Sequence, residues 1–192
     1  MNTPTLGEPR FASTRSHTIN DDLRIPERIE IGAEPGLQLE LAGPRAKLFF
    51  DPKQTRAGIV TCGGLCPGLN NVIRSLFLEL HYGYGVPEVL GFRGGYSGLD
   101  PTSGADPVKV TPQFVDGIHQ KGGTVLSSSR GPVDKARAVD NLIARGVNIL
   151  FTVGGDGTQR GANDLYQEAR RRGYALSVVG VPKTIDNDVG FV

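Results

Sequence analysis

Short apolar runs alternate with longer periodic segments from residue 56 to the end of the chain. Near-continuous apolar runs of about four to eight residues are typical of strands that are buried on both faces of a parallel sheet. The chain has five such runs, and they are Ala57–Thr61, Pro87–Gly91, Gly122–Leu126, Ile149–Val153 and Leu176–Val181. We therefore predict one sheet built from these strands.

Apolar residues recur every three or four positions between these runs, which is the period of an amphipathic helix. The predicted helices are Leu69–Tyr82, Thr111–Gln120 (with Pro112 in its first turn), Val133–Arg145 and Thr158–Arg172. In the third helix we expect Val139, Leu142 and Ile143 on the buried face. Strands that alternate with helices predict an α/β fold, a three-layer sandwich with a mostly parallel sheet.

The first part of the chain has a different character. Residues 1–46 are mixed, contain several prolines and have weak periodicity, so we interpret them as a partly disordered N-terminal extension. A short strand is expected at Lys47–Phe50, and residues 47–192 are expected to form one domain. The chain stops at Val192, four residues after a loop rich in acids, so we expect a fragment of a longer protein.

Composition excludes several classes of partner. The formal net charge of +1 gives no electrostatic basis for binding nucleic acid or an anionic membrane. No apolar stretch reaches the ~18 residues of a transmembrane helix, so we predict no membrane partner. The two cysteines, Cys62 and Cys66, match no zinc-binding spacing and indicate reduced thiols in a cytoplasmic protein.

The loop Gly154–Thr158 joins a predicted strand to a predicted helix. Its glycines allow the backbone to approach an anion, and the N–H groups at a helix start favour phosphate. Asp156 is suited to hold Mg2+ together with phosphate oxygens, and Thr158 is predicted to cap the helix. The alternative is a tight strand-to-helix turn with a capping aspartate.

The loop Pro182–Asp188 carries two acids beside a lysine and a threonine. Asp186 is suited to act as a general base on a hydroxyl, and Asp188 to orient the site or bind metal indirectly. Thr184 is suited to donate to a transferring phosphoryl group, and Lys183 to supply positive charge. The alternative is a polar turn whose side chains bond to their own backbone. Because the carboxyl ends of parallel strands meet at one edge of a sheet, we expect both loops at one site.

Two further segments are candidate phosphate contacts. Gly63 and Gly64 lie between a predicted strand and a predicted helix, where an anion is favoured, although a plain connecting turn explains them nearly as well. Arg130 follows a strand and a run of serines and is suited to pair with a phosphate. An isolated arginine is more often solvated.

At these residues the chain resembles the phosphofructokinase family. The resemblance extends from about Pro44 to the end and rests on five motifs in order, which are Thr61–Asn70, Gly91–Leu99, Gly122–Gly131, Gly154–Thr158 and Pro182–Asp188. The last motif separates the chain from lipid and NAD kinases, which share Gly-Gly-Asp-Gly-Thr. The detail is most similar to the branch found in plants, trypanosomatids and bacteria that combines an N-terminal extension with Cys-Gly-Gly-Leu-Cys-Pro-Gly-Leu-Asn.

The resemblance implies a role for each matching residue. The residues implied at the ATP site are Gly64, Tyr96, Arg130, Gly131, Gly155, Asp156, Gly157, Thr158 and Lys183, and Asp156 is implied to hold Mg2+. Thr184, Asp186 and Asp188 are implied to face the acceptor, fructose 6-phosphate, with Asp186 as the base on its 1-hydroxyl. The resemblance also implies that residues 47–192 form a nucleotide-binding domain, that the second domain of the family is missing from this chain, and that the full-length protein is a homo-oligomer.

The resemblance also bears on the phosphoryl donor. In the family, enzymes that use ATP have a glycine after the metal-binding aspartate, and enzymes that use pyrophosphate have an aspartate there. In this chain the residue is Gly157. Lys183 stands where pyrophosphate enzymes have lysine, and the pair is similar to the plant-type ATP enzymes. We expect an ATP-dependent 6-phosphofructokinase. The alternatives are a pyrophosphate-dependent enzyme and a non-catalytic, nucleotide-binding fragment.

Overall fold

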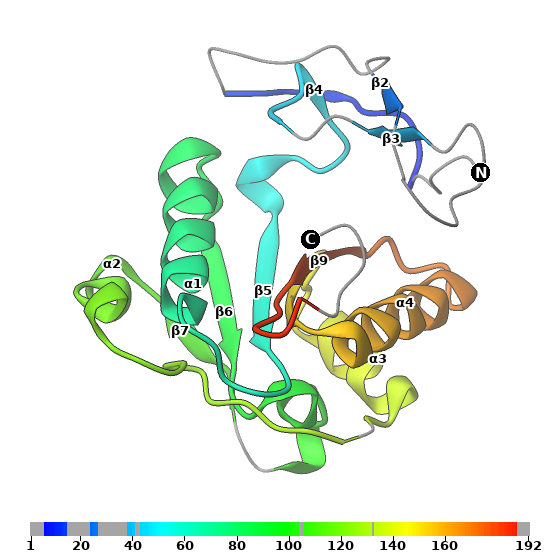
Figure 1. Cartoon of the computed structure of the whole chain (residues 1–192). Helices are drawn as coiled ribbons and strands as arrows, with labels where there is room; N and C mark the ends of the chain where they lie inside the picture. Colours follow the sequence, from blue (N-terminus) through cyan, green and yellow to red (C-terminus); the bar gives the residue numbers. More distant parts are fainter. Residues whose placement is uncertain are drawn as a thin grey trace. The chain divides into compact units, whose positions relative to one another are not determined.

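The computed structural model describes residues 6–14, 24–26, 38–40, 43–103, 106–131 and 133–187. The chain divides into two units, Met1–Asp51 and Pro52–Val192. In the first unit the paired antiparallel strands are β1 (Phe11–Ala12) with β4 (Lys47–Leu48), and β2 (Arg24–Pro26) with β3 (Gln38–Glu40) (Figure 1). β4 covers the first half of the strand predicted at Lys47–Phe50. Much of the extension predicted as partly disordered lies outside the described residues.

The second unit is built on a five-stranded sheet with the order β7-β6-β5-β8-β9. Its strands are β5 (Arg56–Thr61), β6 (Glu88–Phe92), β7 (Val108–Val110), β8 (Ile149–Gly154) and β9 (Ser177–Pro182). β5 pairs in parallel with β6 and β8, and β8 pairs in parallel with β9, whereas β7 is antiparallel to β6. The sheet is therefore mixed but mostly parallel, as predicted.

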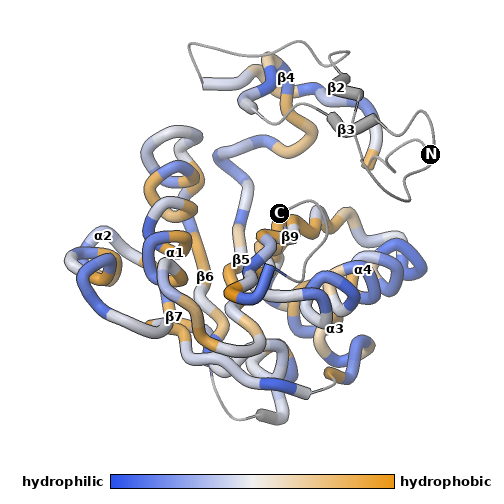
Figure 2. Tube along the Cα trace, viewed as in Figure 1, coloured by the Kyte–Doolittle hydropathy of each residue, from blue (hydrophilic) through white to orange (hydrophobic). Residues whose placement is uncertain are grey.

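Helices cover both faces of this sheet. The helices are α1 (Leu69–Leu78), α2 (Pro112–Val115), α3 (Lys135–Ala144) and α4 (Asp156–Arg171) (Figure 1). One buried cluster joins Ile73 and Phe77 of α1 to Ile59 of β5, and the other joins Leu142 of α3 to Leu150 of β8. Figure 2 shows hydrophobic residues along the strands and hydrophilic ones on the outer side of α4. These three layers confirm the predicted α/β class.

The strand predicted at Gly122–Leu126 is wrong, because this segment is an irregular loop. The Asn70 side chain forms hydrogen bonds with the backbone of this loop. It accepts from the Val125 N–H at 2.8 Å and donates at 2.9 Å to the carbonyl of Lys121, the residue before the segment. Leu126 is apolar because it packs on the sheet, where a Cβ on Gly91 would lie 2.5 Å from its Cδ2. The antiparallel strand β7 was not predicted, since three residues interrupted by a lysine carry little signal.

Each of the four predicted helices is present, but three details of the predictions need correction. Thr111–Gln120 is a short helix followed by a 3-10 turn (Ile118–Gln120), because Gly117 between them takes a positive φ of 68°. The predicted helix Leu69–Tyr82 continues beyond Leu78 as a π-helical turn, Glu79–Gly83. On α3, Val139 and Leu142 are buried as predicted, but Ile143 is 37% exposed. Among the described residues, no helix has both the length and the apolar character needed to cross a membrane.

We predict that Asn70→Ala lowers the free energy of unfolding by about 2–3 kcal/mol, because it leaves the Val125 N–H without its side-chain acceptor. Asn70 is 2% exposed, so little water reaches the vacated site. The measurement is chemical denaturation, with Asn71→Ala at the exposed neighbouring position as the matched control. Equal stabilities of the two variants would contradict the role of Asn70 in holding this loop.

Candidate functional site

The site lies where the connections of the sheet change direction. From β5 the chain passes through α1 on one face to β6, and from β8 it passes through α4 on the other face to β9. The loops after the adjacent strands β5 and β8 therefore diverge at their carboxyl ends. Such a switch point in an open α/β sheet leaves a crevice, and ligands bind there.

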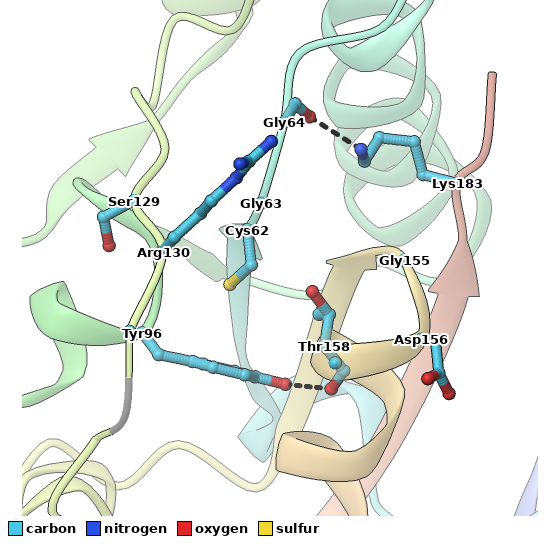
Figure 3. Close-up of a pocket in the computed structure, with 12 residues that line it drawn as sticks. Cys62, Gly63, Gly64, Tyr96, Ser129, Arg130, Gly155, Asp156, Thr158 and Lys183 are labelled. Carbon is cyan, nitrogen blue, oxygen red and sulfur yellow. Dashed lines mark hydrogen bonds between the residues drawn. The ribbon is translucent and has the colours of Figure 1, made fainter. Parts of the chain in front are cut away.

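A pocket of about 300 Å³ occupies this crevice (Figure 3). It is lined by all nine residues that the resemblance implied at the ATP site, which are Gly64, Tyr96, Arg130, Gly131, Gly155, Asp156, Gly157, Thr158 and Lys183. Gly63, which the sequence offered with Gly64 as a candidate phosphate contact, also lines it. Two residues that were not predicted complete the lining, namely Cys62 and Ser129, and both lie inside the quoted motifs.

The start of α4 forms one wall of the pocket. Gly155 is the N-cap and the helix begins at Asp156, so the prediction of Thr158 as the cap is wrong. Thr158 is instead buried within the first turn, and its Oγ1 would lie 2.2 Å from a Cβ on Gly154. Glycine at position 154 thus allows the turn to close tightly. The first N–H groups of a helix have no intrahelical acceptor, so this wall favours an anion.

Asp156 presents a carboxylate at the rim of this wall. Its side chain is 58% exposed and forms an ion pair with Arg160 one turn later, with 2.6 Å between Oδ2 and Nη2. Among the described residues no group of three histidine, cysteine or acidic side chains is arranged to hold a metal ion. The single exposed carboxylate of Asp156 on the pocket lining is a donor set that suits an ion such as Mg2+, which can take one protein carboxylate and complete its shell with phosphate oxygens and water.

Tyr96 and Cys62 form the inner wall. The Tyr96 side chain is 7% exposed, and its hydroxyl donates to the Thr158 carbonyl at 2.6 Å. Its ring lies against Gly161, where a Cβ would be 2.5 Å from Cε2. Burial, and to a lesser extent the nearby Cys62, raises the pKa of Tyr96, so the hydroxyl keeps its proton. Tyr96 therefore supports the first turn of α4 as well as lining the pocket.

Two cations flank the backbone of Gly64. Lys183 Nζ donates to the Gly64 carbonyl at 2.6 Å, and Figure 3 shows the two groups meeting at the mouth of the pocket. A Cβ on Gly64 would lie 3.1 Å from Nη2 of Arg130, so glycine leaves room for the guanidinium. The pocket therefore combines a helix start, two positive side chains and one carboxylate. Charge-assisted hydrogen bonds from such cations bind phosphate strongly.

The second predicted loop lies next to this pocket. Its first residue, Pro182, is the last residue of β9, and the next, Lys183, donates its N–H to the Gly154 carbonyl at 3.0 Å. Thr184 lines a separate hollow of about 230 Å³ beside the start of α1. The N–H of the exposed Asp186 donates to Thr184 Oγ1 at 3.2 Å, which is the local turn hydrogen bond named as the alternative for this loop. Asp188 lies outside the described residues.

A phosphofructokinase family model matches residues 56–192 of the chain. The chain belongs to the phosphofructokinase family. It is 56% identical over 155 residues to an ATP-dependent 6-phosphofructokinase of Trypanosoma cruzi, which covers 81% of this chain and 32% of the relative. It is 53% identical to an ATP-dependent 6-phosphofructokinase of Amycolatopsis methanolica, covering 97% and 44%. This phosphofructokinase chain thus spans less than half the length of these relatives.

The solved structures support the same fold. A pyrophosphate-dependent phosphofructokinase from Marinobacter aquaeolei matches with a TM-score of 0.64 and 23% identity, covering 71% of this chain and 35% of that one. At this identity the match establishes the fold alone. It also shows that the fold of this phosphofructokinase chain is shared by proteins named for pyrophosphate.

We predict that Cys66 reacts rapidly with a thiol reagent and that Cys62 does not. Both thiols are free, but burial raises the pKa of Cys62 to about 12, so near pH 8 almost no thiolate forms there. Cys66 is partly exposed beside the smaller hollow. The measurement is reaction with an aromatic disulfide between pH 7 and 9. The Cys66→Ser variant should lose the fast phase and the Cys62→Ser variant should retain it. A fast phase in both variants would contradict the burial of Cys62.

Proposed function

We propose that this chain forms the phosphoryl-donor part of an ATP-dependent 6-phosphofructokinase. The reaction transfers the γ-phosphoryl group of ATP to the 1-hydroxyl of D-fructose 6-phosphate and gives fructose 1,6-bisphosphate, a step of glycolysis. One observation carries the proposal. The pocket at the carboxyl ends of β5 and β8 brings together the start of α4, the Asp156 carboxylate and the cations Arg130 and Lys183.

The geometry supports a division of roles between the two loops. Phosphoryl transfer depends mainly on positioning and on stabilising charge, plus a group that takes the proton of the attacking hydroxyl. Arg130, Lys183 and the start of α4 offset the charge of the donor phosphates. Asp186, exposed after β9, accepts the proton of the 1-hydroxyl, and Thr184 donates to the transferred group. We also assign Asp188 a supporting role at the acceptor site. This role comes from the resemblance alone, since Asp188 lies outside the described residues.

Asp156 is the residue that would hold Mg2+. When bound, the ion would supply further neutralisation of the donor phosphates. The proposal rests on the exposed carboxylate of Asp156 at the rim of the pocket. The Arg160 guanidinium now paired with it must move or share the carboxylate when the ion binds.

The choice of ATP over pyrophosphate is supported at Gly157. This residue lines the pocket, and a Cβ built on it would meet nothing within 4 Å. The space is available for the inner phosphates of a nucleotide. The relatives at 56% and 53% identity are named ATP-dependent. A pyrophosphate-dependent enzyme is the second candidate, favoured by the lysine at position 183 and by the fold neighbour named for pyrophosphate.

We further propose a cytoplasmic location and, for the full-length protein, a homo-oligomer. The free thiols of Cys62 and Cys66 are consistent with a reducing compartment. The homo-oligomer follows only from the resemblance to the family.

The test is a coupled assay for fructose 1,6-bisphosphate in the longest natural protein that contains these 192 residues. Fructose 6-phosphate is supplied with either ATP or pyrophosphate. We expect turnover with ATP and far less with pyrophosphate, whereas turnover with pyrophosphate alone would replace the first proposal by the second. No turnover with either donor, together with ATP binding by calorimetry, would favour the non-catalytic fragment.

A further inference from the structure

Gln159 lies over the place where the two loops of the site leave the sheet. It follows Thr158 in the first turns of α4 and is partly buried. Its Nε2 donates to the Gly154 carbonyl at 2.9 Å and lies 3.4 Å from the Val181 carbonyl. Gly154 ends β8, just before the segment Gly155–Thr158, here called the donor loop, and Val181 is the penultimate residue of β9, just before the segment Lys183–Asp186, here called the acceptor loop. One side-chain amide therefore spans the ends of both strands.

The sequence of β9 makes room for this side chain. A Cβ on Gly180 would lie 1.9 Å from Gln159 Oε1 and 3.1 Å from its Cδ. Gly180 is not one of the glycines with a positive φ, so backbone conformation gives no reason for glycine here. The reason is the close approach of the Gln159 amide to the backbone of β9.

The Gly154 carbonyl is a shared acceptor. Besides Gln159 Nε2 it accepts the N–H of Lys183, the first residue of the acceptor loop, at 3.0 Å. A carbonyl oxygen has two lone pairs, so both bonds form together. The last residue of β8 is thereby tied to α4 on one side and to the acceptor loop on the other.

We propose that Gln159 is a positioning residue that sets the spacing between the donor loop Gly155–Thr158 and the acceptor loop Lys183–Asp186. This inference rests on the proposed kinase function, and it assigns Gln159 no contact with substrate, nucleotide or metal. In-line transfer needs the acceptor hydroxyl close to the phosphorus, and a displacement of about 1 Å can cost about 100-fold in rate.

The first test replaces the side chain. We expect Gln159→Ala to lower kcat by about 10- to 100-fold while the KM for ATP changes by less than about threefold, because the pocket walls remain but the acceptor loop shifts. Gln159→Glu keeps the size and loses the N–H donor, so it should behave alike, and it carries the test if the alanine variant does not fold. Gln167→Ala, on the exposed side of the same helix, is the matched control. Unchanged kcat in both Gln159 variants would overturn the inference.

The second test uses the contact with Gly180. Gly180→Ala should lower kcat, because the added methyl group pushes the Gln159 amide away. In the double variant Gln159→Ala/Gly180→Ala the methyl group has room, so its kcat should equal that of Gln159→Ala alone. Losses that multiply in the double variant would show that Gly180 serves something other than Gln159, and would overturn this part of the inference.

A third measurement is independent of turnover. Hydrogen exchange of the Lys183 amide should accelerate by about tenfold or more in Gln159→Ala, while the Cys62 amide, which donates to the Val153 carbonyl, stays protected. If the unaltered protein has no fructose 6-phosphate-dependent turnover, the proposed function fails, and exchange alone decides whether Gln159 holds the loop. If the unaltered protein is active and the Gln159 variants match it in kcat and exchange, the positioning role fails and the function stands.

Discussion

Asp186→Ala is expected to lower turnover by about 10³-fold, because it removes the group that we propose takes the proton from the 1-hydroxyl of fructose 6-phosphate. The side chain is exposed on the loop after β9, so its removal creates no cavity in the core. ATP affinity should change by only a few-fold, since Asp186 does not line the donor pocket. The measurements are kcat from the coupled assay and ATP binding by calorimetry.

Two comparison variants sharpen this prediction. Asp186→Asn retains the size and the local turn but is a poor base, so it should be nearly as slow as the alanine variant. Asp116→Ala removes an exposed acid that does not line the pocket and should leave turnover unchanged. Near-normal turnover of Asp186→Ala would remove the assignment of the base, and a large loss of ATP affinity would place Asp186 on the donor side.

Gly157→Asp is expected to lower the preference for ATP over pyrophosphate by about 100-fold, measured as the ratio of the two kcat/KM values. The new carboxylate would occupy the open space at position 157, where we propose that the inner phosphates of the nucleotide bind. Like charges brought together at a binding site cost several kcal/mol, and about 3 kcal/mol corresponds to roughly a hundredfold. Pyrophosphate lacks the nucleoside and its α-phosphate and is expected to be affected less.

The fold should tolerate this change. Position 157 lies in the first turn of α4, where the helix dipole favours an acidic side chain. A Cβ there meets no neighbour within 4 Å. Gly157→Ala is the control for added volume without charge and should change the ratio far less. If ATP turnover survives unchanged in Gly157→Asp, the account of donor choice by space and charge at this position is wrong.

Much of the donor pocket follows from local sequence. The runs that form β5 and β8 and the glycine loops after them predict two parallel strand ends, and such ends meet at one edge of a sheet. The nine residues that line one pocket with them were implied at the ATP site by the resemblance to the family, since Tyr96 and Arg130 come from other loops. The acceptor loop is less determined, since Thr184 and Asp186 form a local turn and Asp188 lies outside the described residues.

The errors have a common physical cause. Gly122–Leu126 has the composition of a buried strand, but the Asn70 side chain takes its backbone bonds and Leu126 packs over Gly91. Thr158 has the residue type of a cap, but the helix begins two residues earlier and buries it. In the first case a contact between distant segments overrides a local preference, and in the second the residue at which the helix begins does so.

The sequence by itself determined the α/β class, four parallel strands, the helices between them and the loops that carry phosphate chemistry, because periodicity and glycine placement are local properties. Only the tertiary structure decided which groups meet. The Lys183 ammonium on the Gly64 carbonyl, the Tyr96 hydroxyl on the Thr158 carbonyl and the Gln159 amide across β8 and β9 join residues separated by 119, 62 and up to 22 positions. Such contacts depend on how the strands are ordered and how closely glycine lets neighbours approach, which no local pattern records.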